Sequence, residues 1–212
     1  MKKTVFFLIL LVPILVSPQS KFSSVKLGLF SPGATEAGFI IGYEGGWYVD
    51  DNFLIGYSAD WFNKNYVDKS FVSQINDVYG PNSVLNELRA KTNLHSIPVM
   101  GSVTGNWVIA SRTRAFITGA AGVEVLLIFY RDYTNPNDDK FQGAFDFSWR
   151  LGFGIMYELG KRSDAFAEIS YHHSKPNWQY DVRDPNTGIR HTFERSYDMS
   201  GAMMRLGFRF YF

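Results

Sequence analysis

Polar and apolar residues alternate along most of the chain after residue 20, and the alternation is clearest between residues 141 and 157. There, every second residue is large and apolar: Phe145, Phe147, Trp149, Leu151, Phe153 and Ile155. The residues between them are small or polar: Asp146, Ser148, Arg150, Gly152 and Gly154. A period of two is typical of a β-strand whose faces meet different environments. The segment is therefore predicted to be a strand with one strongly apolar face.

The same reading along the chain predicts eight strands, which are separated by turn-forming residues. They cover residues 22–30, 37–48, 53–65, 94–107, 115–130, 141–157, 164–173 and the segment that ends at Phe212. Pro98 falls inside the fourth strand, where it cannot donate a ladder hydrogen bond, so we expect a β-bulge there.

The connections between these strands alternate in length. Short ones cover 50–52, 111–113 and 160–163, and long ones cover 67–93, 132–140 and 174–195, with 31–36 of modest length. Short turns at one end and long loops at the other are typical of transmembrane β-barrels. An open sheet edge cannot exist in lipid, so the sheet should close. The fold class predicted is all-β: an eight-stranded antiparallel up-and-down transmembrane barrel. A soluble β-sandwich is the alternative.

The N-terminal 20 residues have the pattern of a secretory signal peptide. Lys2 and Lys3 are followed by an apolar run over 4–16, interrupted only by Pro13, and by small or polar residues at 17–20, where cleavage is expected. The predicted organisation is a signal peptide over 1–20 and a barrel over 21–212, whose roughly 190 residues are enough for eight spanning strands.

Composition excludes several classes of protein and site. The chain has no Cys, so disulfides, thiolate metal sites and a lipoprotein anchor are not expected. The four His residues have no spacing typical of a metal site, and no cofactor is predicted. No second long apolar run is present to form a helical span. The formal charge of +1 gives no indication of nucleic-acid binding.

Strand parity assigns charged residues of both signs to the barrel interior. The predicted lumen cations are Lys26, Arg150, Arg205 and Arg209, and the predicted lumen anions are Glu44, Asp60, Glu124, Asp146 and Glu168. Eight strands leave room only for side chains, and near-balanced signs favour ion pairs over the single-sign rings of an ion channel. Tryptophans near predicted strand ends are expected to form aromatic girdles: Trp47, Trp61, Trp107 and Trp178. Trp149 lies nearer the middle of its strand and does not fit a girdle.

The last eight residues alternate without a break. Leu206, Phe208, Phe210 and Phe212 fall on one face, and Arg205, Gly207, Arg209 and Tyr211 fall on the other. Arg205, Gly207, Phe210 and Phe212 resemble the C-terminal signal of bacterial outer-membrane β-barrels, and the whole mature chain resembles the small OmpA/OmpX-type barrels. The resemblance implies an integral outer-membrane location, both termini in the periplasm, and recognition by the barrel-assembly machinery. It also implies a non-enzymatic role in envelope integrity, adhesion or surface interaction.

Two long loops are candidate interaction surfaces. In 67–93, apolar residues at helical spacing are broken by Gly80 and Pro81, which favours two short amphipathic helices that either bind a ligand or fold onto the barrel mouth. The loop 174–195 carries Lys175, Arg183, Arg190 and Arg195, which could contact phosphates of lipopolysaccharide.

The sequence leaves two other functions open. One is a small-solute channel resembling the OmpW group. The other is a lipid A 3-O-deacylase, because His172 and Ser174 resemble the His-x-Ser signature of the PagL-type enzymes, with Glu194 as the orienting acid. Lys175 replaces the Asn expected after the serine, and parity points His172 and Ser174 inward, whereas the site of that family faces the lipid.

Overall fold

The computed structural model describes residues 21–67, 91–131, 139–183 and 190–212, which form ten β-strands. The strands are β1 (Lys21–Pro32), β2 (Gly38–Tyr48), β3 (Phe53–Val67), β4 (Lys91–Ala110), β5 (Thr113–Arg131), β6 (Asp139–Gly160), β7 (Ser163–His173), β8 (Asn177–Arg183), β9 (Arg190–Ser196) and β10 (Gly201–Tyr211). The described part of the chain holds no helix that is long and apolar enough to cross a membrane.

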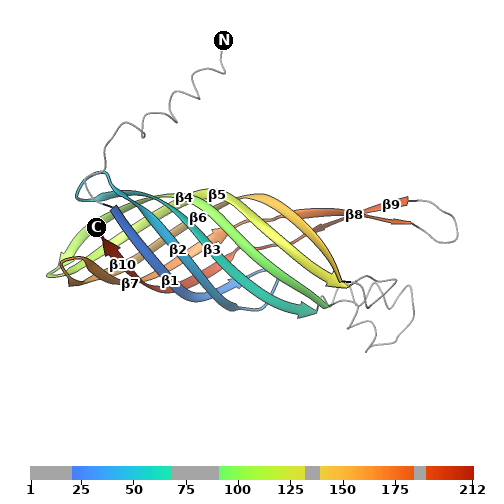
Figure 1. Ribbon diagram of the computed structural model, residues 1–212, viewed down its shortest axis with the longest axis horizontal. Coiled ribbons are helices and arrows are strands. Elements are labelled where there is room, and N and C mark those ends of the chain that lie inside the picture. Colours follow the sequence, from blue (N-terminus) through green and yellow to red (C-terminus); the bar gives the residue numbers. More distant parts are fainter. Residues whose placement is uncertain (1–20, 68–90, 132–138, 184–189) are drawn as a thin grey trace, which may run out of the picture.

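Eight of the strands close into an antiparallel barrel in the order β1-β10-β7-β6-β5-β4-β3-β2. The strands are tilted across the barrel, and the β8–β9 hairpin projects beyond one end of it (Figure 1). Lys21 and Phe212 exchange two backbone hydrogen bonds of 3.1 Å, so the beginning of β1 and the end of β10 lie at the same end of the barrel. We call it the turn end, because the connections 49–52, 111–112 and 161–162 lie there, and we call the opposite end the loop end. The predicted all-β closed barrel is thus confirmed.

The lengths of three strands and the structure of one loop differ from the expectations. β4, β5 and β6 have 20, 19 and 22 residues, well beyond the 9–11 that span a bilayer, because their pairing continues to Arg131 opposite Asp139. The segment 174–195, predicted as a loop, contains the β8–β9 hairpin.

The expected bulge at Pro98 is wrong. Pro98 pairs with Glu124 of β5, and the pairing with β3 keeps one register from Ala59–Val99 to Phe62–Ser96. The missing N–H therefore interrupts the ladder without adding a residue to the strand. Register shifts occur beside two tight turns instead, between Val108 and Ala110 and between Glu158 and Gly160. In the first of these turns, Arg112 has a φ of 61°.

The exterior of the barrel is apolar over most strands. Large side chains that point outward include Leu27, Phe39, Val103, Phe147, Leu151, Phe153, Leu206 and Phe208. Leu206, for example, is 65% exposed. A soluble sandwich would bury this face, whereas a barrel surrounded by lipid presents it to hydrocarbon.

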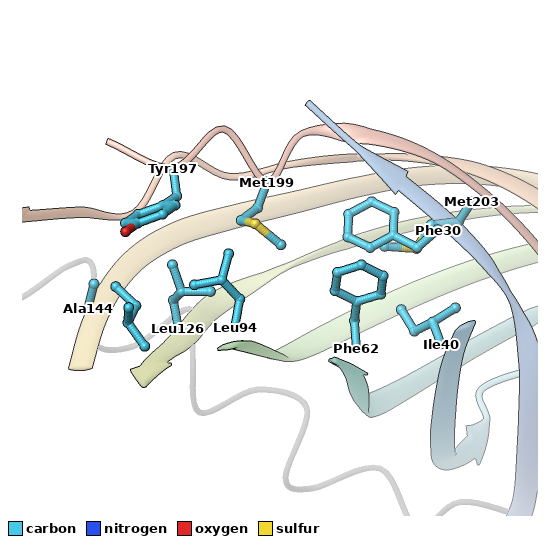
Figure 2. Close-up of a cluster of buried hydrophobic side chains, with 10 residues drawn as sticks. Phe30, Ile40, Phe62, Leu94, Leu126, Ala144, Tyr197, Met199 and Met203 are labelled. Atoms are coloured by element: carbon cyan, nitrogen blue, oxygen red, sulfur yellow. The ribbon is translucent and has the colours of Figure 1, made fainter. Parts of the chain in front are cut away.

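The interior is divided into three layers along the barrel axis. At the turn end, Phe116, Met156 and Phe166 form a small buried cluster. Charged side chains occupy the middle. At the loop end lies a larger apolar cluster of Phe30, Ile40, Phe62, Leu94, Leu126, Ile128, Ala144, Tyr197, Met199 and Met203 (Figure 2).

Candidate functional site: the filled lumen

The middle layer is a buried network of seven charged side chains, which we call the central network. Its members are Lys26, Glu44, Asp60, Arg150, Glu168, Arg205 and Arg209, and all are buried. They come from β1, β2, β3, β6, β7 and β10, and each lies on the inward parity of its strand. The alternation that points aromatic residues at lipid therefore places these charges in the lumen.

Each carboxylate of the central network is shared by two cations. Lys26 Nζ lies 2.7 Å from Glu44 Oε2 and 3.2 Å from Glu168 Oε2. Arg209 also contacts this Glu44 oxygen, from which its Nη2 lies 3.5 Å away. The Nε of Arg209 donates a hydrogen bond of 3.1 Å to Ser24 Oγ.

The other half of the network is centred on Arg205 and Asp60. Arg205 donates through Nη2 to Glu168, and its Nη1 lies 3.0 Å from Asp60 Oδ1. Arg150 Nη1 lies 2.7 Å from Asp60 Oδ2. The ion pairs are therefore continuous across the barrel. Because the charges are desolvated, removing one partner should be costly even where the pair itself adds little net stability.

Glycines in the wall provide the space for these side chains. A Cβ on Gly42 would stand 1.9 Å from Asp60 Oδ1, and one on Gly28 would stand 2.8 Å from Arg205 Cγ and Cα. Both contacts are closer than real Cβ atoms allow, so the network requires glycine at these two inward positions.

Two of the predicted lumen carboxylates belong to a separate polar group nearer the loop end. Glu124 Oε2 lies 2.7 Å from His172 Nε2, and Glu124 Oε1 accepts a 2.7 Å hydrogen bond from Ser96. Asp146 Oδ2 accepts hydrogen bonds from Ser174 Oγ at 3.4 Å and from the Lys175 backbone N–H at 2.5 Å. Within the described residues, neither carboxylate forms an ion pair with Lys or Arg, so neither belongs to the central network.

The residues of the hydrolase alternative are not arranged as a catalytic set. His172 and Ser174 are both buried, and each has a carboxylate partner of its own, Glu124 and Asp146 respectively. The side chain of Glu194 lies outside the described residues. The serine that contacts a histidine is Ser200, whose Oγ lies 2.9 Å from His173 Nδ1 and also donates to the Ser174 carbonyl at 3.2 Å. In the described part of the chain, no group of three His, Asp or Glu side chains could hold a metal ion.

Three of the four tryptophans predicted for the aromatic girdles lie on the outer surface. Trp47, Trp107 and Trp61 point outward, the first two near the turn end and Trp61 near the loop end. Trp61 Nε1 donates to His95 Nδ1 at 3.1 Å. The side chain of Trp178 and the whole of 68–90, including the expected loop helices, lie outside the described residues, as do the side chains of Arg183, Arg190 and Arg195.

The C-terminal motif divides between lumen and lipid. Arg205 belongs to the central network, and Gly207 leaves room for the ring of Phe166, whose Cζ would lie 2.4 Å from an added Cβ. Phe210 and Phe212 point outward.

The loop-end apolar cluster was not anticipated from the sequence. Leu94, Leu126, Ile128 and Met203 share the inward parity of the lumen charges, so the alternation contained the signal. Tyr197 and Met199 follow β9 outside any strand pattern, and only the fold places them in this cluster. Their segment is held by backbone hydrogen bonds from Met199 N to Ser174 O and from Ala34 N to Asp198 O, of 3.0 and 2.7 Å.

No protein-family model and no curated protein matches the chain. Solved structures with a similar fold include the outer membrane protein OprG from Pseudomonas aeruginosa (TM-score 0.62, 13% identity, covering 91% of this chain and 95% of that one). A major outer membrane protein from Thermus thermophilus is also similar (TM-score 0.56, 11% identity, 91% and 99%), as is Neisserial surface protein A (TM-score 0.53, 10% identity, 90% and 95%). At these identities, the likeness concerns the fold. The chain therefore has the fold of the small eight-stranded outer-membrane β-barrels.

Proposed function

We propose that this protein is a non-enzymatic outer-membrane barrel whose lumen is sealed and whose loop end acts in envelope integrity or surface interaction. The observation that carries the proposal is that three layers fill the interior in series. They are the turn-end cluster of Phe116, Met156 and Phe166, the central network, and the loop-end apolar cluster of ten residues. The apolar exterior and the fold support an integral position in the outer membrane.

The proposed orientation places both termini and the short turns in the periplasm. The long strands β4, β5 and β6 and the β8–β9 hairpin would then extend from the cell surface. Short periplasmic turns and long extracellular loops are the usual arrangement of such barrels. The partners we propose are outer-membrane lipid and lipopolysaccharide around the barrel, the barrel-assembly machinery at 205–212, and an extracellular ligand at 67–93 or 174–195.

A small-solute channel is less well supported. Ions would have to pass the loop-end cluster, where Phe62, Leu94, Leu126, Ile128 and Met199 have no accessible surface. The central network offers opposed charges at close range, not the single-sign ring that favours one kind of ion.

A lipid A deacylase is also less well supported. A serine nucleophile needs its base within hydrogen-bond reach and access to the substrate. Ser174 Oγ instead donates to Asp146, no hydrogen bond joins it to His172 among the described residues, and Ser174 has no accessible surface.

Expression in the outer membrane of a host that lacks the protein tests the proposal. Uptake of a small chromogenic substrate should stay at the level of the host, while cell-surface adhesion or autoaggregation should change. Replacing 184–189, which connects β8 and β9, or 68–90, which connects β3 and β4, with Gly and Ser should abolish the surface effect in one of the two variants and leave the barrel assembled in both. Uptake that rises with expression would instead favour a channel.

A further inference from the structure

The turn end of the barrel contains an open cavity that the sealed-lumen function does not use. Its volume is about 410 Å³, which lies in the range of small-molecule sites. Charged residues that line it come from β5, β6, β7 and two turns: Arg114, Glu158, Asp164, Asp51 and Lys161. We call this cavity the turn-end pocket. The cluster of Phe116, Met156 and Phe166 lies deeper in the barrel, since these residues are two positions further along their strands from Arg114, Glu158 and Asp164.

Two carboxylates of the turn-end pocket stand directly opposite each other. Glu158 of β6 pairs with Asp164 of β7 across the sheet, and like charges in this position destabilise a sheet. Asp164 is buried and accepts a hydrogen bond from Tyr211 through Oδ2, and Tyr211 in turn accepts one from Tyr48 at 3.2 Å. Within the described residues, Asp164 Oδ1 and the Glu158 carboxylate have no hydrogen-bond or ion-pair partner. Arg114 and Arg209 offset part of this repulsion at Asp164, and an ammonium group bound beside Glu158 would offset it further.

The opposite charge is available on the neighbouring strand. Arg114 of β5 pairs with Met156 and is thus diagonal to Glu158, two residues away on β6. Its guanidinium forms no hydrogen bond or ion pair in the part of the chain that the structure describes. A planar guanidinium is best matched by a carboxylate, which it can bind through two parallel hydrogen bonds. The turn-end pocket therefore presents an ammonium site and a carboxylate site side by side.

The net charge of the turn-end pocket favours one kind of ligand among those that carry both an ammonium and a carboxylate group. Three carboxylates (Asp51, Glu158 and Asp164) and two cations (Arg114 and Lys161) line the turn-end pocket, which gives it a formal charge of −1. We propose that it binds a free cationic amino acid of the lysine class, with an ammonium group between Glu158 and Asp164 and the carboxylate on Arg114. This site is independent of the proposed surface role, since it lies at the other end of the barrel.

Titration calorimetry of the refolded mature chain in detergent micelles tests the proposal, with L-lysine and L-lysine methyl ester as probes. At about pH 6 the amino groups of both probes stay protonated, so the ester differs only by loss of the carboxylate charge. Lysine should bind saturably, and the ester about tenfold more weakly, as expected for one lost charge-assisted hydrogen-bonded contact.

Variants locate the site. Arg114→Gln should bind lysine about tenfold more weakly and no longer distinguish lysine from the ester. Glu158→Gln should weaken both probes. Lys64→Gln, which changes a cation on β3 toward the loop end, should leave both affinities unchanged.

Every variant must keep the heat-dependent gel shift of a folded barrel; if one does not fold, the comparison of lysine with its ester on the unaltered chain decides. Absence of saturable lysine binding would overturn the proposal. Equal binding of the ester, or an Arg114→Gln variant that binds lysine as well as the unaltered chain does, would also overturn it.

Discussion

Replacing Asp60 with Asn removes the charge on which two buried arginines depend. Asp60 Oδ2 is the ion-pair partner of Arg150, and Oδ1 is one of two partners of Arg205. The central network holds four cations and three carboxylates, a formal charge of +1, and Asp60→Asn raises this to +2 among side chains that are buried from solvent. Breaking a buried pair by removing one partner typically costs about 3–5 kcal/mol. Asn keeps one acceptor oxygen, so we expect a loss of about 3 kcal/mol, near the lower limit.

A second substitution separates loss of charge balance from loss of packing. Arg150 has two guanidinium nitrogens, Nε and Nη2, without a hydrogen-bond partner within the described residues, so it is the cation that the network can best lose. The double variant Asp60→Asn with Arg150→Met returns the network to three cations and two carboxylates, again +1. It should recover much of the stability, because a well-packed apolar residue often replaces a buried charge without net cost.

Urea unfolding of the barrel refolded into lipid vesicles measures both effects, followed by tryptophan fluorescence and by the heat-dependent gel shift. With a typical m-value, about 3 kcal/mol corresponds to a fall in the urea midpoint of roughly 1 M. The matched control is Glu36→Gln, which removes an exposed partner of Lys64 at 3.7 Å and should cost less than about 1 kcal/mol. An Asp60→Asn midpoint as close to the unaltered chain as that control would refute the desolvated network, and so would a double variant less stable than the single one.

Three further predictions concern other parts of the barrel. Arg112→Gly should stabilise the barrel by up to about 1 kcal/mol in the same urea assay, because Arg112 has a left-handed φ of 61°; a loss of stability would contradict the assignment of strain to this turn. Met199→Ala should cost about 2–5 kcal/mol, since Met199 is fully buried in the loop-end cluster, whereas the outward-facing Met204→Ala should cost clearly less; equal effects would mean that the cluster is loosely packed. Deleting Phe212 should lower the fraction that assembles in cells and shows the heat-dependent gel shift, and unchanged assembly would refute the C-terminal signal.

The sequence predicted the barrel because its evidence is local. Strand parity depends only on alternating residues, and in the structure Leu206 and Phe208 lie on the outer face while Arg205 and Arg209 are buried in the lumen. The predicted strands are shorter than β4 to β6, since at the loop end the pairing continues through polar residues such as Arg131 and Asp139, where no alternation indicates a strand.

The partners within the lumen could not be predicted from parity. It placed Glu124 and Asp60 alike inside, but Asp60 meets two arginines and Glu124 meets His172 and Ser96, because barrel shear sets which inward residues share a level. Met199 lies in no strand, so its place in the apolar cluster depends on backbone hydrogen bonds to distant segments. The turn-end pocket could not be predicted for a similar reason: Glu158 lies just beyond the predicted sixth strand, and its pairing with Asp164 depends on the register between β6 and β7.

Planar-bilayer conductance of the refolded mature chain, after the heat-dependent gel shift has confirmed folding, tests the sealed lumen most directly. We predict no steady ionic current, because an apolar cluster and a paired charge network block the axis in series. Combining Met199→Ala with Tyr197→Ala should raise the rate of brief current events, since both side chains belong to the loop-end cluster. A steady, reproducible current through the folded, unaltered barrel would contradict a sealed lumen and make this protein a channel.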